Sequence, residues 1–598
     1  MNETIGIIPR AFRRRGVWVA CTLLLRAGLN FLGLAMLLPV LALVLDPGSL
    51  EGGGVLARAY EGLGFASQRT FALAVCAAVV GVIVLKSLLG LWLARVERNY
   101  IFALYRTLSR RLLVTYHDRG LPFVKASNSA VLARNVNVVC LAFAAGVLKP
   151  AAAIAAEAML LVLLFGALMW YTPLAALLAL TVFLPSIWLY YGLVRNRINR
   201  YGELENKAQR EKARLVAETF RGYADIEINN AFPMMLRQFD RAMDQVIRTR
   251  LRETAIGLLP QTFTEVGLAV GMALLVALSL GDGDGRAQML FGVFAVAALR
   301  LMPSVRNIMT GWTAIKYNRY TIGILRDAAA DCPPAPANPD CRDTPGPRST
   351  SAATVAPGNS GNPGNPAADT ASSPEKLPFR HEIAVRDLRF RFADGGRELF
   401  HGLSLTIRKG ERIGIRGASG AGKTTLFNLL LGLYEPSGGE IAIDGTPLTA
   451  ANRRAWQNRI GYVSQNLFIA DGSFAANVAL GIPAGEVDRE RVMQALRAAQ
   501  LGELVTGLAK GIDTHVGECG CRLSGGQRQR IGIARALYRQ ADVLFFDEAT
   551  SALDSRTEEE INRSIAGLAA RDAGLTLVVI AHRESSLEYC NRIITIGE

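Results

Sequence analysis

Six long apolar runs in the first half of the chain constrain its fold more than any other feature. They lie at 17–45, 70–94, 138–169, 173–194, 254–280 and 287–313. Each has about the 20 residues that a helix needs to cross the hydrocarbon core of a bilayer. Because a bilayer offers the backbone no hydrogen-bond partner, such runs are stable there as α-helices. The sequence therefore predicts an α-helical domain of six membrane spans over residues 1–328.

The charges between these runs predict how the helices cross the membrane. The formal net charge is +15, and residues 1–328 supply the whole excess, with 36 basic and 20 acidic side chains. Loops 95–137 and 195–253 have net charges of +6 and +4, whereas loops 46–69 and 281–286 each have −1. Basic loops stay in the cytoplasm, so both termini and both long loops are expected there. This alternation argues against the core helices of a soluble protein, and it explains the basic charge without a nucleic-acid partner.

The connections between the spans are expected to be of two kinds. The third and fourth runs nearly touch, with Tyr171-Thr172-Pro173 as the only break between them, which predicts a tight hairpin. The long cytoplasmic loops are polar with spaced apolar positions, so we expect the spans to continue as helices into the cytoplasm. Their turns are predicted near 118–128 and 204–215.

A linker separates the two halves of the chain. Eleven prolines fall in 331–378, with Gly, Asn, Ser, Thr and Ala around most of them. Such a composition cannot bury a core and predicts a disordered tether, so we set the domains at 1–328, 329–379 and 380–598. The eight cysteines have no paired zinc spacing, which favours free thiols over a metal site.

The second half opens with a phosphate-binding motif, GASGAGKTT at 417–425, between an apolar strand at 412–415 and a helix at 426–430. This strand–loop–helix context is the one that a P-loop needs, and it predicts an α/β nucleotide-binding domain. Lys423 is expected on the β- and γ-phosphates and Thr424 on Mg²⁺. The predicted ATP-binding residues of this loop are Gly417, Ser419, Gly420, Gly422, Lys423, Thr424 and Thr425.

A second motif, VLFFDEATSALD at 543–554, ends an apolar strand with two carboxylates. Asp547 is expected to hold Mg²⁺, directly or through water. Glu548 is placed to orient and polarise an attacking water. The alternative is an ordinary exit from a strand into a loop.

The motif LSGGQRQR at 523–530 offers a further anion site where it opens a helix. The phosphate loop already provides one anion-binding site for the nucleotide. A second such site at LSGGQ suggests that another copy of the chain closes over the nucleotide. The residues concerned are Ser524, Gly525, Gly526 and Gln527.

The order of these three motifs resembles the ATP-binding cassette (ABC) family. The resemblance covers 380–598 and, with the six spans, extends over 1–328 as the fused half-transporter of the exporter type. It implies ATP hydrolysis coupled to transport in a homodimer, with two ATP molecules each held between the phosphate loop of one copy and LSGGQ of the other. The family's C-terminal hairpin and helix have no counterpart before Glu598.

The resemblance assigns further residues of the nucleotide site. Gln465 matches the glutamine that senses Mg²⁺ and the membrane domain, and His582 matches the histidine that contacts the γ-phosphate. Residues 551–554 match the loop that crosses the dimer interface, and 516–518 match a segment found in exporters. Phe392 matches the aromatic side chain that stacks on adenine; the alternative is a core position in a strand.

Seven ionisable residues lie within or beside the spans: Arg26, Lys86, Lys149, Glu157, Glu265, Arg300 and Arg306. Because charges inside a membrane are costly, they usually face an interior or a partner. Glu265 and Arg300 fall near mid-depth, and we predict that they pair or share a cavity. Lys149 is expected to reach the interface instead.

Segments 37–47, 84–96 and 298–309 resemble the bacterial flippases of lipid-linked oligosaccharides that serve protein glycosylation. This implies an inner-membrane protein whose substrate is a polyprenyl-pyrophosphate glycan, bound by Lys86, Arg300 and Arg306, with Glu265 in the same cavity. A short helix within 46–69 is implied for the lipid tail, although a plain external loop is equally consistent. The alternatives are export of lipid A, drugs or peptides, and a soluble ABC ATPase, which the six spans argue against.

Overall fold

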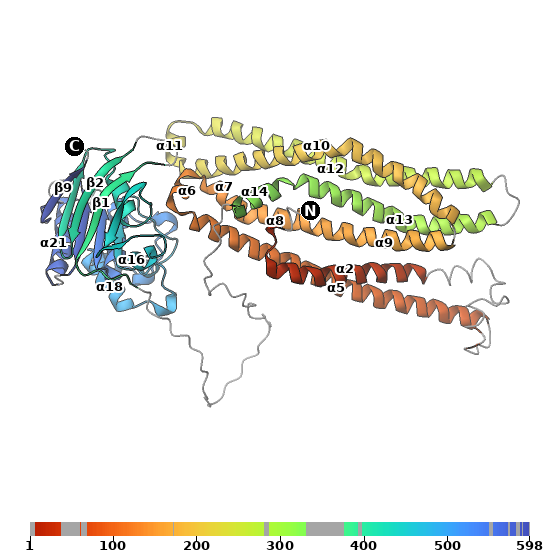
Figure 1. The fold of residues 1–598 in the computed structure, drawn as a ribbon, viewed down its shortest axis with the longest axis horizontal. Helices are drawn as coiled ribbons and strands as arrows, with labels where there is room; N and C mark the ends of the chain where they lie inside the picture. Colours follow the sequence, from red (N-terminus) through yellow and green to blue (C-terminus); the bar gives the residue numbers. More distant parts are fainter. Residues whose placement is uncertain are drawn as a thin grey trace, which may run out of the picture. The chain divides into compact units, whose positions relative to one another are not determined.

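Long helices form the first unit of the chain, Met1–Pro345, and a mixed α/β fold forms the second, Gly346–Glu598, in the computed structural model (Figure 1). The structure describes residues 6–36, 60, 62, 68–171, 173–279, 286–330, 376–392, 398–548, 554–571, 574–581, 587–588 and 590–596. Most of the predicted linker and of loop 46–69 lies outside these residues, as does the end of the first predicted span.

Helices of the first unit coincide with all six predicted spans. They are α2 (Arg10–Ala35), α5 (Gln68–Asp118), α9 (Lys149–Tyr171), α10 (Pro173–Arg221), α12 (Phe232–Ser279) and α13 (Arg286–Tyr317). The chain upstream of α9 is also helical. Helix α7 (Ser129–Arg134) leads through a π-helical turn, Asn135–Val139, into α8 (Cys140–Phe143), and a second π-helical turn, Ala144–Leu148, leads from α8 into α9. Among the described residues, Phe12–Gly33, Arg69–Asp118 and Ser129–Trp170 are long and apolar enough to cross a membrane.

The bundle packs around two apolar clusters. Helices α9, α10 and α13 share the first, in which Phe183, Phe294 and Leu301 are buried. Helix α5, the start of α2, the segment around α8 and α14 (Tyr320–Ala330) share the second, which contains Leu104 and Phe143. Only Thr172 separates α9 from α10, which confirms the predicted tight hairpin.

The first of the two predicted turns lies where the sequence predicts it. Helix α5 ends at Asp118, α6 (Gly120–Ala126) follows, and α7 starts after Asn128. The Asn128 side chain accepts a hydrogen bond from the backbone of Ala130, at 2.9 Å, and so caps α7.

The prediction of a second turn near 204–215 is wrong. Helix α10 continues unbroken to Arg221, and the chain reverses through α11 (Tyr223–Ile228) before α12 begins at Phe232. Residues 204–215 contain strong helix formers and neither glycine nor proline. The helix ends just before Gly222, and Asn230, which has a φ of 48°, lies in the turn before α12.

Polar contacts join helices α7, α10 and α12. The buried carboxylate of Glu205 on α10 forms an ion pair with Arg250 on α12, at 2.7 Å. Beside it, Arg134 of α7 donates to Asn206, also at 2.7 Å. Removing the partner of a buried carboxylate is strongly destabilising. These contacts therefore hold α7, α10 and α12 against one another.

Two sheets form the second unit. The antiparallel sheet has the order β2 (Phe400–Arg408), β1 (Glu382–Phe390), β4 (Gly438–Ile443) and β5 (Thr446–Pro447). The parallel sheet has the order β6 (Ile460–Val463), β7 (Val543–Asp547), β8 (Thr576–Ile580), β3 (Arg412–Gly417) and β9 (Arg592–Ile596). Strands β7 and β8 are buried throughout and are apolar except for Asp547 at the end of β7 and Thr576 at the start of β8, as central parallel strands require.

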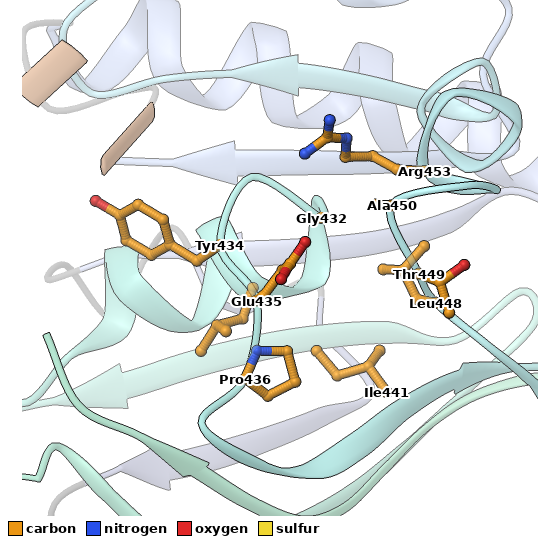
Figure 2. A pocket seen from close by; sticks show the side chains of 10 residues that line it. Gly432, Tyr434, Glu435, Pro436, Ile441, Leu448, Thr449, Ala450 and Arg453 are labelled. Atoms are coloured by element: carbon orange, nitrogen blue, oxygen red, sulfur yellow. The ribbon is translucent and has the colours of Figure 1, made fainter. Parts of the chain in front are cut away.

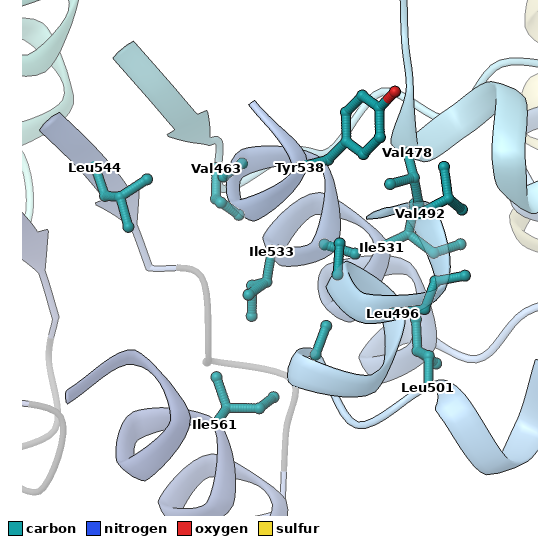
Figure 3. Close-up of a cluster of buried hydrophobic side chains, with 14 of the residues drawn as sticks. Val463, Val478, Val492, Leu496, Leu501, Ile531, Ile533, Tyr538, Leu544 and Ile561 are labelled. Atoms are coloured by element: carbon teal, nitrogen blue, oxygen red, sulfur yellow. The ribbon is translucent and has the colours of Figure 1, made fainter. Parts of the chain in front are cut away.

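Helices complete this unit. They are α15 (Lys423–Leu430), α16 (Arg453–Gln457), α17 (Phe474–Val478), α18 (Arg489–Ala498), α19 (Gly502–Thr506), α20 (Gly525–Tyr538) and α21 (Ser555–Arg571). Figure 3 shows the core in which α20 packs between α18 and the parallel sheet, through Leu496, Ile531 and Leu544. This core holds the start of α20 in a fixed place.

The contact between α10 and α13 yields a stability prediction. A Cβ on Gly202 would lie 1.9 Å from the Tyr317 carbonyl oxygen, whereas one on Gly192 of the same helix meets nothing within 4 Å. We expect Gly202→Ala to cost about 1–3 kcal/mol through overpacking and to lower the melting temperature in detergent. Gly192→Ala is the matched control, and an equal melting temperature for the two variants would contradict the close approach.

Candidate functional site

The parallel sheet brings the predicted nucleotide-site residues to one edge. Strands β3, β6, β7 and β8 run in the same direction, so their carboxyl ends lie together. Gly417 ends β3, Asp547 ends β7, and Gln465 follows β6. Residues far apart in the sequence therefore share one site, as the motif order predicts.

The phosphate loop has the backbone that its glycines allow. Gly420 and Gly422 have φ values of 84° and 92°, a region that other residues rarely adopt. Gly422 is the residue that precedes α15, and a Cβ on Gly417 would lie 2.4 Å from the carbonyl oxygen of Ile596. The loop is thus a curled set of backbone N–H groups at the start of a helix, which favours a phosphate.

Lys423 lies inside this loop. Its side chain is 7% exposed, and its Nζ donates to the carbonyl oxygens of Gly417, at 2.8 Å, and Ala418, at 3.0 Å. The amine is therefore held next to the backbone that would surround a phosphate group, as the sequence predicts.

Asp547 and Thr424, two of the three predicted metal-binding residues (the third is Gln465), are in contact. The Thr424 hydroxyl donates to Asp547 Oδ1 at 3.3 Å, and Asp547 is 1% exposed. Burial, and then the negative charge of Asp547, raise the pKa of the neighbouring Tyr462 phenol. A hydroxyl and a carboxylate beside a phosphate loop are hard oxygen donors, and Mg²⁺ commonly binds one or two carboxylates together with substrate phosphates. The residues present therefore fit MgATP.

Gln465 and Glu548, two of the predicted catalytic residues, are in direct contact. Gln465 Nε2 donates to Glu548 Oε2 at 2.7 Å. Glu548 has a φ of 51°, a left-handed value that is uncommon for a residue other than glycine, and its backbone N–H donates to the carbonyl of Ile580 on β8. The backbone and Gln465 together fix the direction of the carboxylate.

The LSGGQ motif begins α20 with a reciprocal cap. The Ser524 hydroxyl accepts from the backbone N–H of Gln527, at 3.2 Å, and the Gln527 side chain accepts from the Ser524 N–H, at 2.9 Å. Within one chain both side chains therefore stabilise the helix start. The same cap aims the first N–H groups of α20, including those of Gly525 and Gly526, outward.

Phe392 lies just beyond β1 and is 41% exposed, so it is not a strand-core residue. Its ring meets Phe390 edge-on at 5.0 Å and Tyr434 at 6.1 Å, and Phe390 stacks on Tyr434 at 5.5 Å. Tyr434 belongs to this aromatic cluster but has no sequence spacing that could have indicated it. Phe392 keeps an open ring surface on which adenine could stack.

Some predicted residues lie outside the part of the chain that the structure describes. These are His582 and residues 551–553. Asp554 is described, and it accepts a hydrogen bond from the backbone of Thr557 at the start of α21, which lowers the pKa of its carboxyl group.

A small pocket lies at the opposite end of α15 from the phosphate loop. Figure 2 shows its lining, with Tyr434 and Glu435 on one side and Thr449 and Arg453 on the other. None of the predicted ATP-binding residues lines it, so it is not the nucleotide site.

In the membrane half, the charges of two of the predicted cavity residues act on each other. Arg300 on α13 lies near enough to Lys86 on α5 for their charges to repel. The Lys86 side chain also runs along α2, where a Cβ on Gly33 would come within 2.9 Å of Nζ. Neither cation has an ion-pair partner among the described residues.

The other predicted cavity residues do not join this pair. Glu265 forms no ion pair with Arg300 among the described side chains; it is exposed and accepts a hydrogen bond from Gln261, at 2.8 Å. Arg306 follows Arg300 by six residues, about 120° around a regular helix, and so points from another face of α13. Sequence reasoning could find each charged residue, but it could not find its neighbours.

Glu157 has partners that the sequence does not indicate. Its carboxylate accepts from Ser304, at 2.7 Å, and from Asn307, at 3.0 Å, and so joins α9 to α13. Paired positions on two distant helices give no sequence signal.

Comparisons with known proteins agree with this geometry. Residues 400–551 match the family model described as ABC transporter. An ATP-dependent lipid A-core flippase of Burkholderia pseudomallei is 31% identical over 428 residues, which is 70% of this chain and 64% of that protein. A protein of the same name from Ralstonia nicotianae is 30% identical over 438 residues, covering 72% and 67%. The alignments thus span about two thirds of the relatives' length.

A solved structure matches nearly the whole fold. The structure of a bacterial Atm1-family ABC exporter with ATP bound superposes with a TM-score of 0.73, at 22% sequence identity, and covers 98% of this chain and 94% of the other. The predicted fold class, a helical transmembrane domain joined to an α/β nucleotide-binding domain, is confirmed.

The cap of α20 yields a prediction for the signature motif. Ser524→Ala removes the side-chain acceptor at the helix start, at a cost of about 1 kcal/mol. We expect the amides at 526–528 to exchange with solvent several-fold faster than in the unaltered protein, as measured by hydrogen exchange. Ser524→Asp retains a good cap and is expected to exchange at the original rate. Unchanged exchange in Ser524→Ala would contradict the structural role of the cap.

Proposed function

Since the chain belongs to the ABC transporter family, with the helical transmembrane and nucleotide-binding domains of an exporter, we propose that it is an ATP-driven flippase. The proposed substrate is a phosphate-bearing glycolipid, moved from the inner to the outer leaflet of a bacterial inner membrane. The proposed active form is a homodimer, because each chain has one phosphate loop and one LSGGQ motif.

The observation that carries the substrate class is the mutual repulsion of the Lys86 and Arg300 charges. Two like charges inside a membrane are costly unless an anion is near them, and the described side chains supply none. At 1.5 Å per residue they lie roughly 24 Å and 20 Å from the outer ends of their spans, which puts Lys86 on the cytoplasmic side of the middle and Arg300 at the middle. This position favours a phosphate headgroup that enters from the inner leaflet.

The chemistry of the headgroup agrees with the residue types. A phosphate or pyrophosphate has two or more negative charges, and an arginine offers two parallel N–H donors to its oxygens. In a surrounding of low dielectric constant, these contacts are stronger than in water.

Two members of this substrate class are candidates. The names of the relatives favour lipid A-core, which carries phosphates on its sugars. The likeness of segments 37–47, 84–96 and 298–309 to other flippases favours a polyprenyl-pyrophosphate oligosaccharide. Both present an anionic sugar-bearing headgroup to the same pair of cations.

The nucleotide site supports hydrolysis through this chain's own side chains. The backbone of the phosphate loop and Lys423 would bind the phosphates, and Thr424 and Asp547 would hold Mg²⁺, which neutralises the charge on them when bound. Glu548 is held by Gln465 at 2.7 Å, with its carboxylate ready to orient a water and accept its proton. In the proposed dimer, the N–H groups after Ser524 face the nucleotide of the other copy.

Replacing Glu548 tests the ATPase part of the proposal. Glu548→Gln keeps the shape and the hydrogen-bonding capacity of the side chain but cannot take a proton. We expect it to bind ATP with unchanged affinity and to hydrolyse it about 10²–10⁴-fold more slowly, measured as phosphate release and nucleotide binding on the same purified sample. Hydrolysis at the original rate would remove Glu548 from the role of base.

Replacing Arg300 tests the substrate part. Proteoliposomes that contain either lipid A-core or a polyprenyl-pyrophosphate oligosaccharide would be assayed for ATP-dependent flipping. Because a hydrogen bond to a charged group contributes about 1.5–3 kcal/mol, we expect Arg300→Ala to reduce flipping roughly ten- to a hundredfold and to leave basal ATP hydrolysis measurable.

Arg300→Lys, which keeps the charge but loses the paired donors, is the matched control and should retain an intermediate rate. Flipping of only one of the two lipids identifies the substrate. Flipping of neither lipid by the unaltered protein, or equal flipping by Arg300→Ala, would contradict the proposed substrate class.

A further inference from the structure

Two exposed cysteines lie immediately before the LSGGQ motif. Cys519 and Cys521 are separated only by Gly520, and both side chains are accessible, whereas Cys140 is buried and Cys590 is partly buried. Among the described residues no group of three or more His, Cys, Asp or Glu side chains is arranged to hold a metal ion. The thiol pair is thus outside any metal site, and the nucleotide chemistry does not use it.

The backbone at this point is strained. Cys519 has φ 51° and ψ 19°, and Gly520 follows with φ 69°. Glycine adopts this region freely, but a cysteine there is uncommon and costs free energy. Hydrogen bonds from Cys521 to the Glu518 carbonyl, at 3.1 Å, and from Gly520 to the Gly517 carbonyl, at 3.0 Å, hold the turn. The strain is therefore stabilised by the local fold.

The turn keeps the two thiols within reach of each other. Two residues of chain span at most about 7 Å even when fully extended, and the turn at Gly520 shortens this further. Disulfides join Cα atoms about 4.4–6.8 Å apart. The Cys521 sulfur now lies over Gly517, at the place where a Cβ on that glycine would be 2.7 Å away. Bond formation therefore requires the Cys521 side chain to leave Gly517 and turn toward Cys519.

We propose that Cys519 and Cys521 form a redox switch that controls the nucleotide site. In the reaction, one thiolate attacks a sulfur of a low-molecular-weight disulfide such as oxidised glutathione, and one thiol of that reagent leaves. The second cysteine then attacks the mixed disulfide and releases the second thiol. The protein loses two electrons and two protons to the reagent, and the Cys519–Cys521 bond forms. A dithiol reductant reverses the reaction.

The position of the pair explains how oxidation would reach the nucleotide site. Leu523 donates to the carbonyl of Gly520 at 3.0 Å, and Arg522 donates to that of Val516 at 3.3 Å, so the turn leads directly into the Ser524 cap. Withdrawal of the Cys521 sulfur from Gly517 changes the packing of the segment at 516–518. The start of α20 then moves relative to the nucleotide of the partner copy.

The other cysteines provide internal contrasts. Burial raises the pKa of the Cys590 thiol to about 11, so it stays protonated and unreactive near neutral pH. Cys21 on α2 and Cys76 on α5 are exposed, but each stands alone on a spanning helix. Cys332 and Cys341 lie outside the described residues.

The test uses the full-length protein in nanodiscs, treated with oxidised glutathione and then with dithiothreitol. Peptide mass spectrometry reads the peptide that contains residues 519–521, and ATP hydrolysis is measured on the same samples. We expect this peptide to become lighter by two hydrogen atoms, hydrolysis to fall roughly tenfold, and the reductant to restore both. The mass readout does not depend on the proposed transport activity, so a protein without measurable hydrolysis still tests the disulfide.

The variants Cys519→Ser, Cys521→Ser and the double substitution separate the pair from the other thiols, with Cys76→Ser as the matched control. The first three should keep hydrolysis under oxidation, and Cys76→Ser should lose it as the unaltered protein does. A peptide with glutathione on each cysteine, a disulfide between two chains on a non-reducing gel, or unchanged hydrolysis after full oxidation would each overturn the proposal. Sensitivity that persists in the double variant would also overturn it.

Discussion

The parallel pairing of β3, β6, β7 and β8 is the constraint on which the nucleotide site depends. Backbone hydrogen bonds align the carboxyl ends of these strands, so the loops that follow them meet at one edge. Gly417 from one strand end, Asp547 from another and Gln465 from the next loop are brought together by this pairing alone. Without this strand pairing, these three residues would have no reason to lie near one another.

Local interactions then refine this arrangement. The glycines of the phosphate loop supply positive φ values, and the left-handed Glu548 turns its carboxylate toward Gln465. The capping box at Ser524 fixes the start of α20 in the same way. The uncommon backbone conformations among these features cost free energy, and the packing of the buried core around Ile531 and Leu544 offsets that cost.

In the membrane half, the dominant energy is the cost of charge in an apolar medium. Glu157 meets two neutral donors on α13, and Arg26 pairs with Glu97 at 3.1 Å. Lys86 and Arg300 differ from these residues, because their charges repel each other. This repulsion is the basis for proposing that an external anion binds near them.

Hydrophobic length and short motifs are enough to predict the helices of the first unit, the tight hairpin and the strand before the phosphate loop, and they also point to the residues proposed to bind MgATP. The structure corrects the end of α10, which continues past residue 215 because helix formers extend the helix until Gly222 and its neighbours allow it to end. It also decided that Glu265 contacts Gln261 rather than Arg300, and that Lys86 approaches Arg300. Contacts between side chains on different helices depend on rotation and packing, for which a single sequence has no periodic signal.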